Sequence, residues 1–298
     1  PSQACVLAAV ERARHVGADL IVGFGGGSSM DVAKLVALMA HPQCTQPITE
    51  LYGVDQAKGQ RLPLIQVPTT AGTGSEVTPI AIVTTGETTK MGVVSPPAVT
   101  AATGIDAMVH AIEAYTSKLK RNPLSSLLAR EALRLLACNL DQAVYNGGNL
   151  GARQAMLLGA CLAGQAFANA PVAAVHALAY PLGGHFHIPH GLANSLVLPH
   201  VLRFNLPVAM ADYAELALPL LGERLQAGDH HSRADQFVSE LAQLGSRCEL
   251  PTTLRAVGVP RESLAQLASD AMQQQRLLVN NPRTLTEADA LAIYEAAY

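Results

Sequence analysis

The chain has 298 residues, of which 49% are hydrophobic and 14% are charged, and its net charge is −3. This composition is typical of a globular protein with a sizeable core and excludes a disordered chain. The small negative charge and the lack of a basic run argue against nucleic-acid binding and against a basic membrane-binding helix. Five scattered cysteines without a CxxC pair predict reduced, mostly buried thiols in a cytoplasmic protein.

The N-terminal part predicts a strand, a glycine turn and a helix. Residues 20–24 form an apolar run typical of a buried parallel strand, and Gly25–Gly27 interrupt it. Ser28 or Ser29 is the expected N-cap of the next helix, with Asp31 in its first turn. Together with an amphipathic helix before the strand, this order is typical of a doubly wound α/β sheet.

The glycine turn suggests a nucleotide site. Backbone N–H groups at the start of a helix bind phosphates, although many such turns are glycine-rich for steric reasons alone. A second apolar strand at 62–67 leads into PTTAGTGSE at 68–76, whose hydroxyls can serve ribose and phosphates or only a polar surface. Lys90 is a further possible cofactor contact.

Residues 80–84 and 91–94 predict short strands that could pair as a hairpin. Beyond Ala98 the patterns are helical, which predicts an α/β nucleotide-binding domain at 1–97 and an all-helical domain at 98–298. The expected helices are 101–116, 123–140, 150–168, 172–180, 190–202, 207–221, 232–245, 260–273 and 286–297.

The stretch GIDAMVHAIEAY, residues 104–115, predicts a polar face on an apolar helix. Asp106, His110 and Glu113 fall within a narrow arc at about 100° per residue. Asp106 and His110, four residues apart, can bind one cation, and Glu113 can orient a ligand instead. An ordinary hydrogen-bonded polar face is the alternative.

A segment rich in histidine strengthens the metal interpretation. No Asp, Glu, Lys or Arg lies between Arg153 and Arg203, and this segment contains His176, His185, His187 and His190. Its prolines and histidines argue against a membrane span. One carboxylate and three imidazoles suit iron or zinc, but spacing does not settle which histidines are ligands.

The motifs GGGSSMDVAK, PTTAGTGSEVTP, TAATGIDAMVHAIEAYTS and HALAYPLGGHFHIPHGLAN occur in order along the chain. Together they resemble the iron-containing (group III) alcohol dehydrogenases, which have a dehydroquinate synthase-like fold. The resemblance implies Fe²⁺ or Zn²⁺ bound by Asp106, His110, His176 and His190. It also implies an NAD or NADP site lined by Gly26, Gly27, Ser28, Asp31, Thr69, Thr70, Thr73 and Lys90.

Three departures from that family pattern are visible. The resemblance implies a Rossmann-like domain that is partly missing at its N-terminus, because the family has another βα unit before the point where this sequence starts. We also expect a segment of the family pattern to be omitted between Pro96 and Pro97, which a Cα–Cα distance of about 3.8 Å would refute. Many members have histidine at the position of Tyr180, so Tyr180 and His185 are both candidates for the catalytic proton relay. Tyr180 follows His176 on a helix that we expect to end at Pro181.

The expected activity is hydride transfer between an alcohol, or its aldehyde or ketone, and NAD(P), in a protein that is a homodimer by resemblance. A maleylacetate reductase, a hydroxyacid–oxoacid transhydrogenase or a non-enzymatic nucleotide-binding relative are alternatives. A dehydroquinate synthase-like lyase needs Lys and Arg for phosphate and carboxylate groups, and 154–202 has none.

Overall fold

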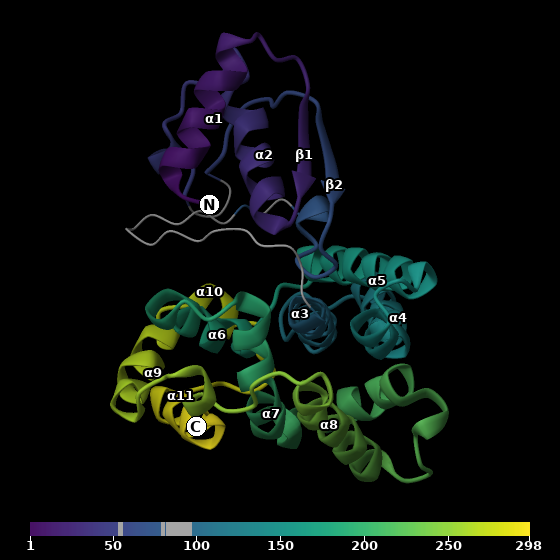
Figure 1. Ribbon diagram of the computed structural model, residues 1–298. Helices are drawn as coiled ribbons and strands as arrows, with labels where there is room; N and C mark the ends of the chain where they lie inside the picture. The colour runs from purple at the N-terminus through teal and green to yellow at the C-terminus, as the bar shows by residue number, and fades with distance from the viewer. Residues whose placement is uncertain (53–55, 79–80, 82–96) are drawn as a thin grey trace. The chain divides into compact units, whose positions relative to one another are not determined.

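A computed structural model describes residues 1–52, 56–78, 81 and 97–298 of the chain. These residues form two compact units (Figure 1): the first lies within Pro1–Thr70 and Ser75–Val94, and the second comprises Ala71–Gly74 and Ser95–Tyr298. The hairpin expected at 80–84 and 91–94, Lys90, and the spacing between Pro96 and Pro97 lie outside the described residues.

The first unit has two helices on one face of a small parallel sheet (Figure 1). Ile21 pairs with Leu64 and Gly25 with Pro68, in register along the strands. Its elements are α1 (Gln3–His15), β1 (Ile21–Gly25), α2 (Gly27–Met39), η1 (Ile48–Glu50), β2 (Leu64–Pro68) and η2 (Ser75–Val77).

One face of this sheet is exposed, which corrects the prediction of a buried strand. Gly23 and Gln66 face α2, where a Cβ on Gly23 would lie 2.8 Å from Ala33 Cβ. The opposite face carries Val22, Phe24, Ile65 and Val67, with exposed fractions of 54, 69, 50 and 37%. An apolar run predicts a strand, but only a layer on each face buries both sets of side chains.

The second unit is helical and is built around α3. The helices are α3 (Pro97–Tyr115), α4 (Pro123–Tyr145), α5 (Leu150–Asn169), α6 (Ala174–Phe186), α7 (His190–Leu221), η3 (Gly222–Arg224), α8 (His230–Arg247), η4 (Arg255–Val257), η5 (Arg261–Ser263), α9 (Leu264–Met272), α10 (Gln275–Leu278) and α11 (Glu287–Ala297).

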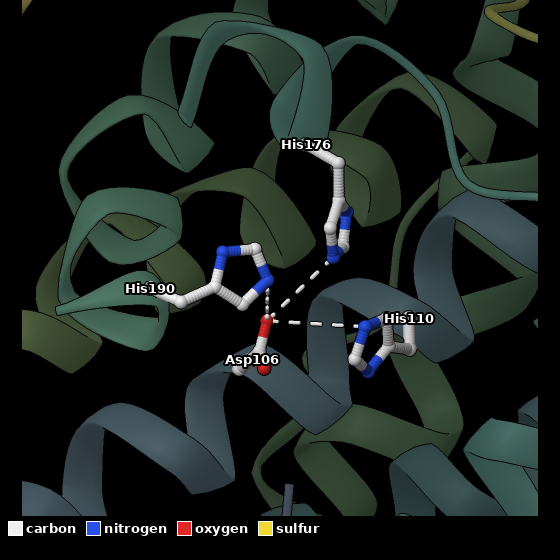
Figure 2. A group of neighbouring side chains, drawn as sticks. All are labelled: Asp106, His110, His176 and His190. Atoms are coloured by element: carbon white, nitrogen blue, oxygen red, sulfur yellow. Dashed lines mark ion pairs between the residues drawn. The ribbon is translucent and has the colours of Figure 1, made fainter. Parts of the chain in front are cut away.

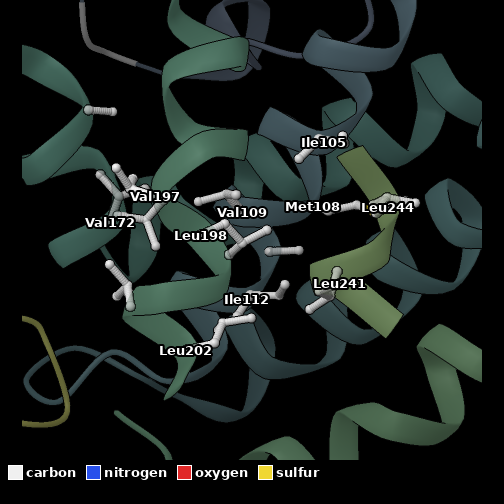
Figure 3. Close-up of a cluster of buried hydrophobic side chains, with 14 of the residues drawn as sticks. Ile105, Met108, Val109, Ile112, Val172, Val197, Leu198, Leu202, Leu241 and Leu244 are labelled. Atoms are coloured by element: carbon white, nitrogen blue, oxygen red, sulfur yellow. The ribbon is translucent and has the colours of Figure 1, made fainter. Parts of the chain in front are cut away.

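Helix α3 is almost entirely buried because neighbours cover it on several sides. It packs on α4, α5 and α7, and Val109 and Ile112 lie beside Leu198 and Leu202 of α7 (Figure 3). On the other side, Met108 lies near the α8 leucines. The polar residues of α3 are therefore held in a rigid apolar surrounding.

Two predictions about helix ends are wrong, and both concern proline. The helix carrying His176 continues through Pro181 to Phe186, and the helices expected at 190–202 and 207–221 are one helix that contains Pro207. Proline has a helical φ and removes a single backbone hydrogen bond. The buried side chains on both sides of each proline keep these helices continuous.

No single helix in the described ranges is both long and apolar enough to cross a membrane. Helices α5 and α6 pass that test only as a pair bent by 106°. Of the five cysteines, Cys248 alone is buried, so the expectation of mostly buried thiols is wrong.

Candidate metal centre and cofactor site

Four side chains from three helices converge in the second unit (Figure 2). Asp106 and His110 project from α3 one turn apart, while His176 comes from α6 and His190 opens α7. The Nε2 atoms of His110, His176 and His190 lie 3.9, 3.6 and 3.5 Å from Asp106 Oδ1. One possible ligand atom from each of the four residues lies within 4.8 Å of all the others.

This arrangement fits a divalent transition metal. Ligand atoms about 2.0–2.2 Å from a tetrahedral ion are about 3.4 Å apart, and the oxygen–nitrogen distances here are close to that value. They are also too long for hydrogen bonds. Asp106, His110 and His176 are buried, whereas the His190 side chain is 44% exposed. The site therefore reaches solvent on the His190 side.

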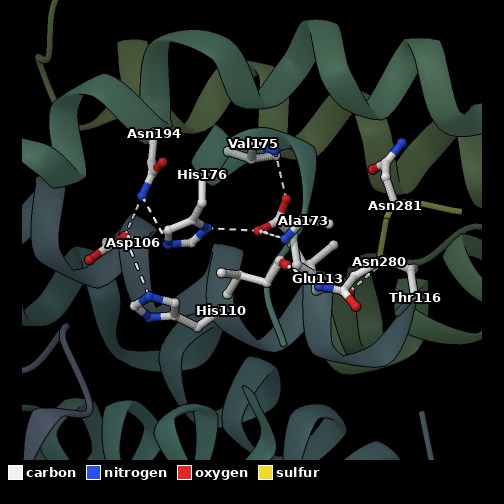
Figure 4. Close-up of polar contacts among 12 residues, drawn as sticks. Asp106, His110, Glu113, Thr116, Ala173, Val175, His176, Asn194, Asn280 and Asn281 are labelled. Carbon is white, nitrogen blue, oxygen red and sulfur yellow. Dashed lines mark hydrogen bonds and ion pairs between the residues drawn. The ribbon is translucent and has the colours of Figure 1, made fainter. Parts of the chain in front are cut away.

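Glu113 fixes the orientation of His176 (Figure 4). Its Oε2 lies 2.7 Å from His176 Nδ1, and its two oxygens accept backbone N–H groups from Ala173 and Val175 at 2.9 and 2.7 Å. An Nδ1–H donated to this carboxylate leaves the Nε2 lone pair facing Asp106. The sequence-based proposal that Glu113 orients a ligand agrees with these contacts.

His110 has its own orienting partner. Its Nδ1 lies 3.2 Å from the carbonyl oxygen of Gly72, and its ring stacks on Phe167 at 4.4 Å. Position 72 needs glycine, because the Cβ of any other residue would lie only 2.9 Å from the Thr103 carbonyl oxygen. The loop 71–74 thus serves the metal centre, which was not foreseen.

Asp106 and the neighbouring histidine rings shift one another's pKa values. Burial by itself raises the pKa of Asp106, but the three rings hold it well below its usual range. Burial lowers the pKa of His110 to about 3. For His176, burial lowers the pKa, but the neighbouring carboxylates of Asp106 and Glu113 outweigh burial and raise the pKa to about 9. Asp106 therefore remains charged beside the rings.

The two predicted relay residues have different surroundings. The Tyr180 ring lies 6.0 Å from the His190 ring, one turn of α6 beyond His176, and burial raises the pKa of its phenol. His185 Nε2 instead lies 2.7 Å from Asp270 Oδ2 on α9, and the side chain is 49% exposed. His185 is not a member of the convergent group.

In the first unit, the start of α2 offers an anion site. Gly26 is the N-cap and no side chain caps this helix, so its first N–H groups face outward from the glycine turn. Thr69 N–H donates to Gly25 O at 2.8 Å, which places Thr70 beside Gly26. The Thr70 hydroxyl is buried and has no hydrogen-bond partner. These groups fit the pyrophosphate of a dinucleotide.

Other predicted cofactor residues are placed differently. Gly27 and Ser28 form the first turn of α2, so the expectation of a serine N-cap is wrong. Asp31 lies in the second turn and is buried, where it accepts from Ser75 Oγ at 2.7 Å and Lys34 Nζ at 3.5 Å. Its carboxylate holds η2 on α2. Thr73 belongs with the second unit.

Sequence reasoning missed Asn194 and Gly191 on α7. Asn194 is fully buried, and its amide nitrogen lies 2.5 Å from Asp106 Oδ1. The available signal was its position four residues after His190, which places both side chains on one helix face. Gly191 touches the α3 backbone, where a Cβ would lie 2.3 Å from Ala102 O.

An α/β unit with a phosphate-binding helix start and a helical unit with an N₃O metal site define a dinucleotide-dependent metalloenzyme. The sequence matches two protein-family models: "Iron-containing alcohol dehydrogenase" over residues 1–107 and "Fe-containing alcohol dehydrogenase family, C-terminal" over residues 100–298. The chain therefore belongs to the iron-containing alcohol dehydrogenase family, as the motifs indicated.

Individual relatives agree with this assignment. Long-chain-alcohol dehydrogenase 1 of Geobacillus thermodenitrificans is 42% identical, over 97% of this chain and 78% of that protein. The crystal structure of a 1,3-propanediol oxidoreductase has a TM-score of 0.92 and 34% identity, covering 100% of this chain and 82% of that one.

A third relative carries the cofactor in its structure. Sulfoacetaldehyde reductase from Bifidobacterium kashiwanohense, solved in complex with NAD⁺, has a TM-score of 0.85 and 29% identity, covering 100% of this chain and 81% of that one. The Geobacillus alignment spans 309 positions against 298 residues here, so that relative has internal positions that this chain lacks.

The family and its relatives establish a metal-dependent oxidoreductase that transfers a hydride between an alcohol, or its aldehyde or ketone, and NAD(P). Its cofactors are a divalent metal, Fe²⁺ or Zn²⁺, and NAD or NADP.

Proposed function

We propose that Asp106, His110, His176 and His190 are the metal ligands of this alcohol dehydrogenase and that the substrate oxygen binds at the His190 side. The observation that carries this proposal is the convergence of three Nε2 atoms on one buried carboxylate oxygen. A bound divalent cation supplies Lewis-acid polarisation of an alcohol or carbonyl oxygen.

The chain contributes geometry and a dry environment around that chemistry. Glu113 and the Gly72 carbonyl each accept an Nδ1–H, which keeps the His176 and His110 lone pairs pointing inward. Phe167 covers the His110 ring and excludes water from that side. The exposed part of His190 leaves one approach for a small alcohol.

We further propose that Gly26, Gly27, Ser28, Thr69, Thr70 and Thr73 contribute to the NAD(P) site. The uncapped start of α2 and the unpartnered Thr70 hydroxyl support this. Asp31 acts there by holding Ser75 and Lys34 in place. Lys90 is retained as a proposed contact on the family resemblance alone.

Tyr180 is the proton relay that the geometry favours over His185. Its ring faces His190, the solvent-side ligand, whereas His185 is engaged by Asp270. Because burial raises the pKa of Tyr180, the phenol stays protonated at neutral pH and can donate. Tyr180→Phe should change the pH profile of kcat while metal content stays normal, and His185→Gln should leave that profile unaltered.

The decisive experiment removes a ligand. His190→Ala should lose most of its metal and its NAD(P)H-dependent turnover of a panel of alcohols and aldehydes, because three ligands remain in an open site. Metal analysis after dialysis measures the first effect. Retention of both metal and turnover would refute the ligand assignment, and bound metal without any turnover in the unaltered protein would favour a non-enzymatic relative.

We also propose a cytoplasmic homodimer with its domain boundary near Pro97. The scattered cysteines without a CxxC pair suit a reducing compartment, and the exposed apolar face of the sheet suits burial against a second copy. Cell fractionation tests the location. Light scattering coupled to size-exclusion chromatography gives the mass of the assembly.

A further inference from the structure

Asn194 lies beside Asp106 and His176 in the proposed metal site, although it is not one of the predicted ligands (Figure 4). Its Nδ2 atom is 2.5 Å from Asp106 Oδ1 and 3.3 Å from the Nε2 atoms of both His176 and His190. One amide group thus contacts ligand atoms that come from α3, α6 and α7. The side chain is fully buried.

The opposite end of the amide is unsatisfied. Asn194 Oδ1 is buried and has no hydrogen-bond partner, which is unfavourable for a polar group in a protein interior. A leucine of similar size would fill the same space without burying an unpartnered oxygen. The role of the amide is therefore sought in the contacts of its nitrogen.

Asp106 depends on that amide for its position. Among the described residues, Asn194 is the one side chain outside the ligand set that donates to the Asp106 carboxylate. A carboxylate oxygen has two lone pairs, so Oδ1 can accept an N–H from Asn194 and still offer one lone pair to a cation. Each Nε2 has a single lone pair, and a bound cation would occupy it. The longer contacts of Asn194 Nδ2 with His176 and His190 would therefore be lost when a cation binds.

We propose that Asn194 is a positioning residue of the metal centre: its amide holds the Asp106 carboxylate in the orientation that binds the ion. This inference rests on the proposed ligand set. It predicts an effect on metal affinity and on ligand geometry, beyond any effect on folding.

The test compares Asn194→Leu with Asn205→Leu, using Co²⁺ as the probe. Asn205 is also a buried asparagine of α7, and it pairs with Asn281 through amide contacts of 3.0 and 2.8 Å. The two substitutions are thus matched in chemistry, burial and helix. Chelator competition gives the Co²⁺ dissociation constant, the visible Co²⁺ spectrum reports ligand geometry, and thermal unfolding reports stability.

We expect Asn194→Leu to bind Co²⁺ roughly 10–100-fold more weakly and with altered visible bands, as is typical when a residue that orients a ligand is removed. Asn205→Leu should lower the unfolding temperature without changing the dissociation constant or the spectrum. If Asn194→Leu does not fold, Asn194→Ala decides, because it removes the same donor without adding bulk.

Affinity within about twofold of the unaltered protein and an unchanged spectrum in a folded Asn194 variant would overturn the positioning role alone. Equal losses in the Asn194 and Asn205 variants would overturn it too, since the effect would then be structural. Failure of the unaltered protein to bind Co²⁺ would overturn the ligand set itself.

Discussion

Glu113 joins the metal centre to the start of a helix. Ala173, the N-cap of α6, has no side chain that can cap, and the carboxylate from α3 accepts the N–H groups of Ala173 and Val175 instead. The same carboxylate accepts from His176 Nδ1. One buried residue therefore fixes both the path of α6 and the ring that α6 carries.

Glu113→Gln should weaken metal binding by roughly 10–100-fold. Glutamine has the same shape, but its amide NH₂ must face one of three donors, which leaves that donor unpaired and turns the ring or loosens the helix start. Metal content after graded dialysis against a chelator measures the effect. Glu131→Gln on the exposed face of α4 is the control, and equal metal retention in the two variants would contradict the orienting role.

Residue spacing predicted part of this centre. The arc shared by Asp106, His110 and Glu113 follows from helix geometry within one segment, and the structure places all three on the inner side of α3. The choice of His176 and His190 over His185 depends on how α6 packs against α7 and α9. Spacing along the chain carries no such information, so the family resemblance was needed to make that choice.

At the scale of elements, the close approach of α7 to α3 brings His190 to Asp106. Gly191 lies in the first turn of α7, and a Cβ there would lie 2.3 Å from the carbonyl oxygen and 2.7 Å from the carbonyl carbon of Ala102. Both are backbone atoms within a buried helix, so they cannot move aside as a flexible side chain can. The glycine sets the distance between the two helices.

Gly191→Ala should therefore separate the start of α7 from α3 and weaken both stability and metal binding. Overpacking of this kind costs about 1–3 kcal/mol. Gly184→Ala in α6 is the matched control, because nothing lies within 4 Å of its added methyl, and alanine there should be neutral or stabilising. Thermal unfolding and metal analysis of both variants make the comparison. A Gly191→Ala protein that binds metal normally would show that helix spacing does not set the site.

Helix identity was easier to predict than helix ends. The apolar period of 3.6 is a local property, and each predicted helical segment overlaps an observed helix. Proline was given too much weight at Pro181 and Pro207. Whether a proline ends a helix depends on the tertiary contacts that outweigh one lost hydrogen bond, and those contacts come from distant segments.

At the scale of the whole molecule, the order of elements was enough to predict an α/β part followed by a helical part. It did not predict that, within the part of the chain that the structure describes, the sheet is covered on one face only, because coverage depends on which other segments pack there. Parallel register places Val22 beside Ile65 and Phe24 beside Val67, so the four exposed side chains form one apolar surface.

This apolar surface predicts concentration-dependent association of the chain with itself. Contiguous exposed apolar side chains on a sheet favour burial against a partner, and the proposed dimer supplies a second copy of the same surface. The double variant Phe24→Ser, Ile65→Thr removes apolar area from both strands while keeping short side chains that a strand tolerates. Its weight-average mass in sedimentation equilibrium should stay at the monomer value at concentrations where the unaltered protein associates. Leu158→Gln, which changes a single exposed leucine of α5, should behave like the unaltered protein. If the double variant associates as strongly as the unaltered protein, self-association uses another surface, and the dimer must be sought away from this sheet.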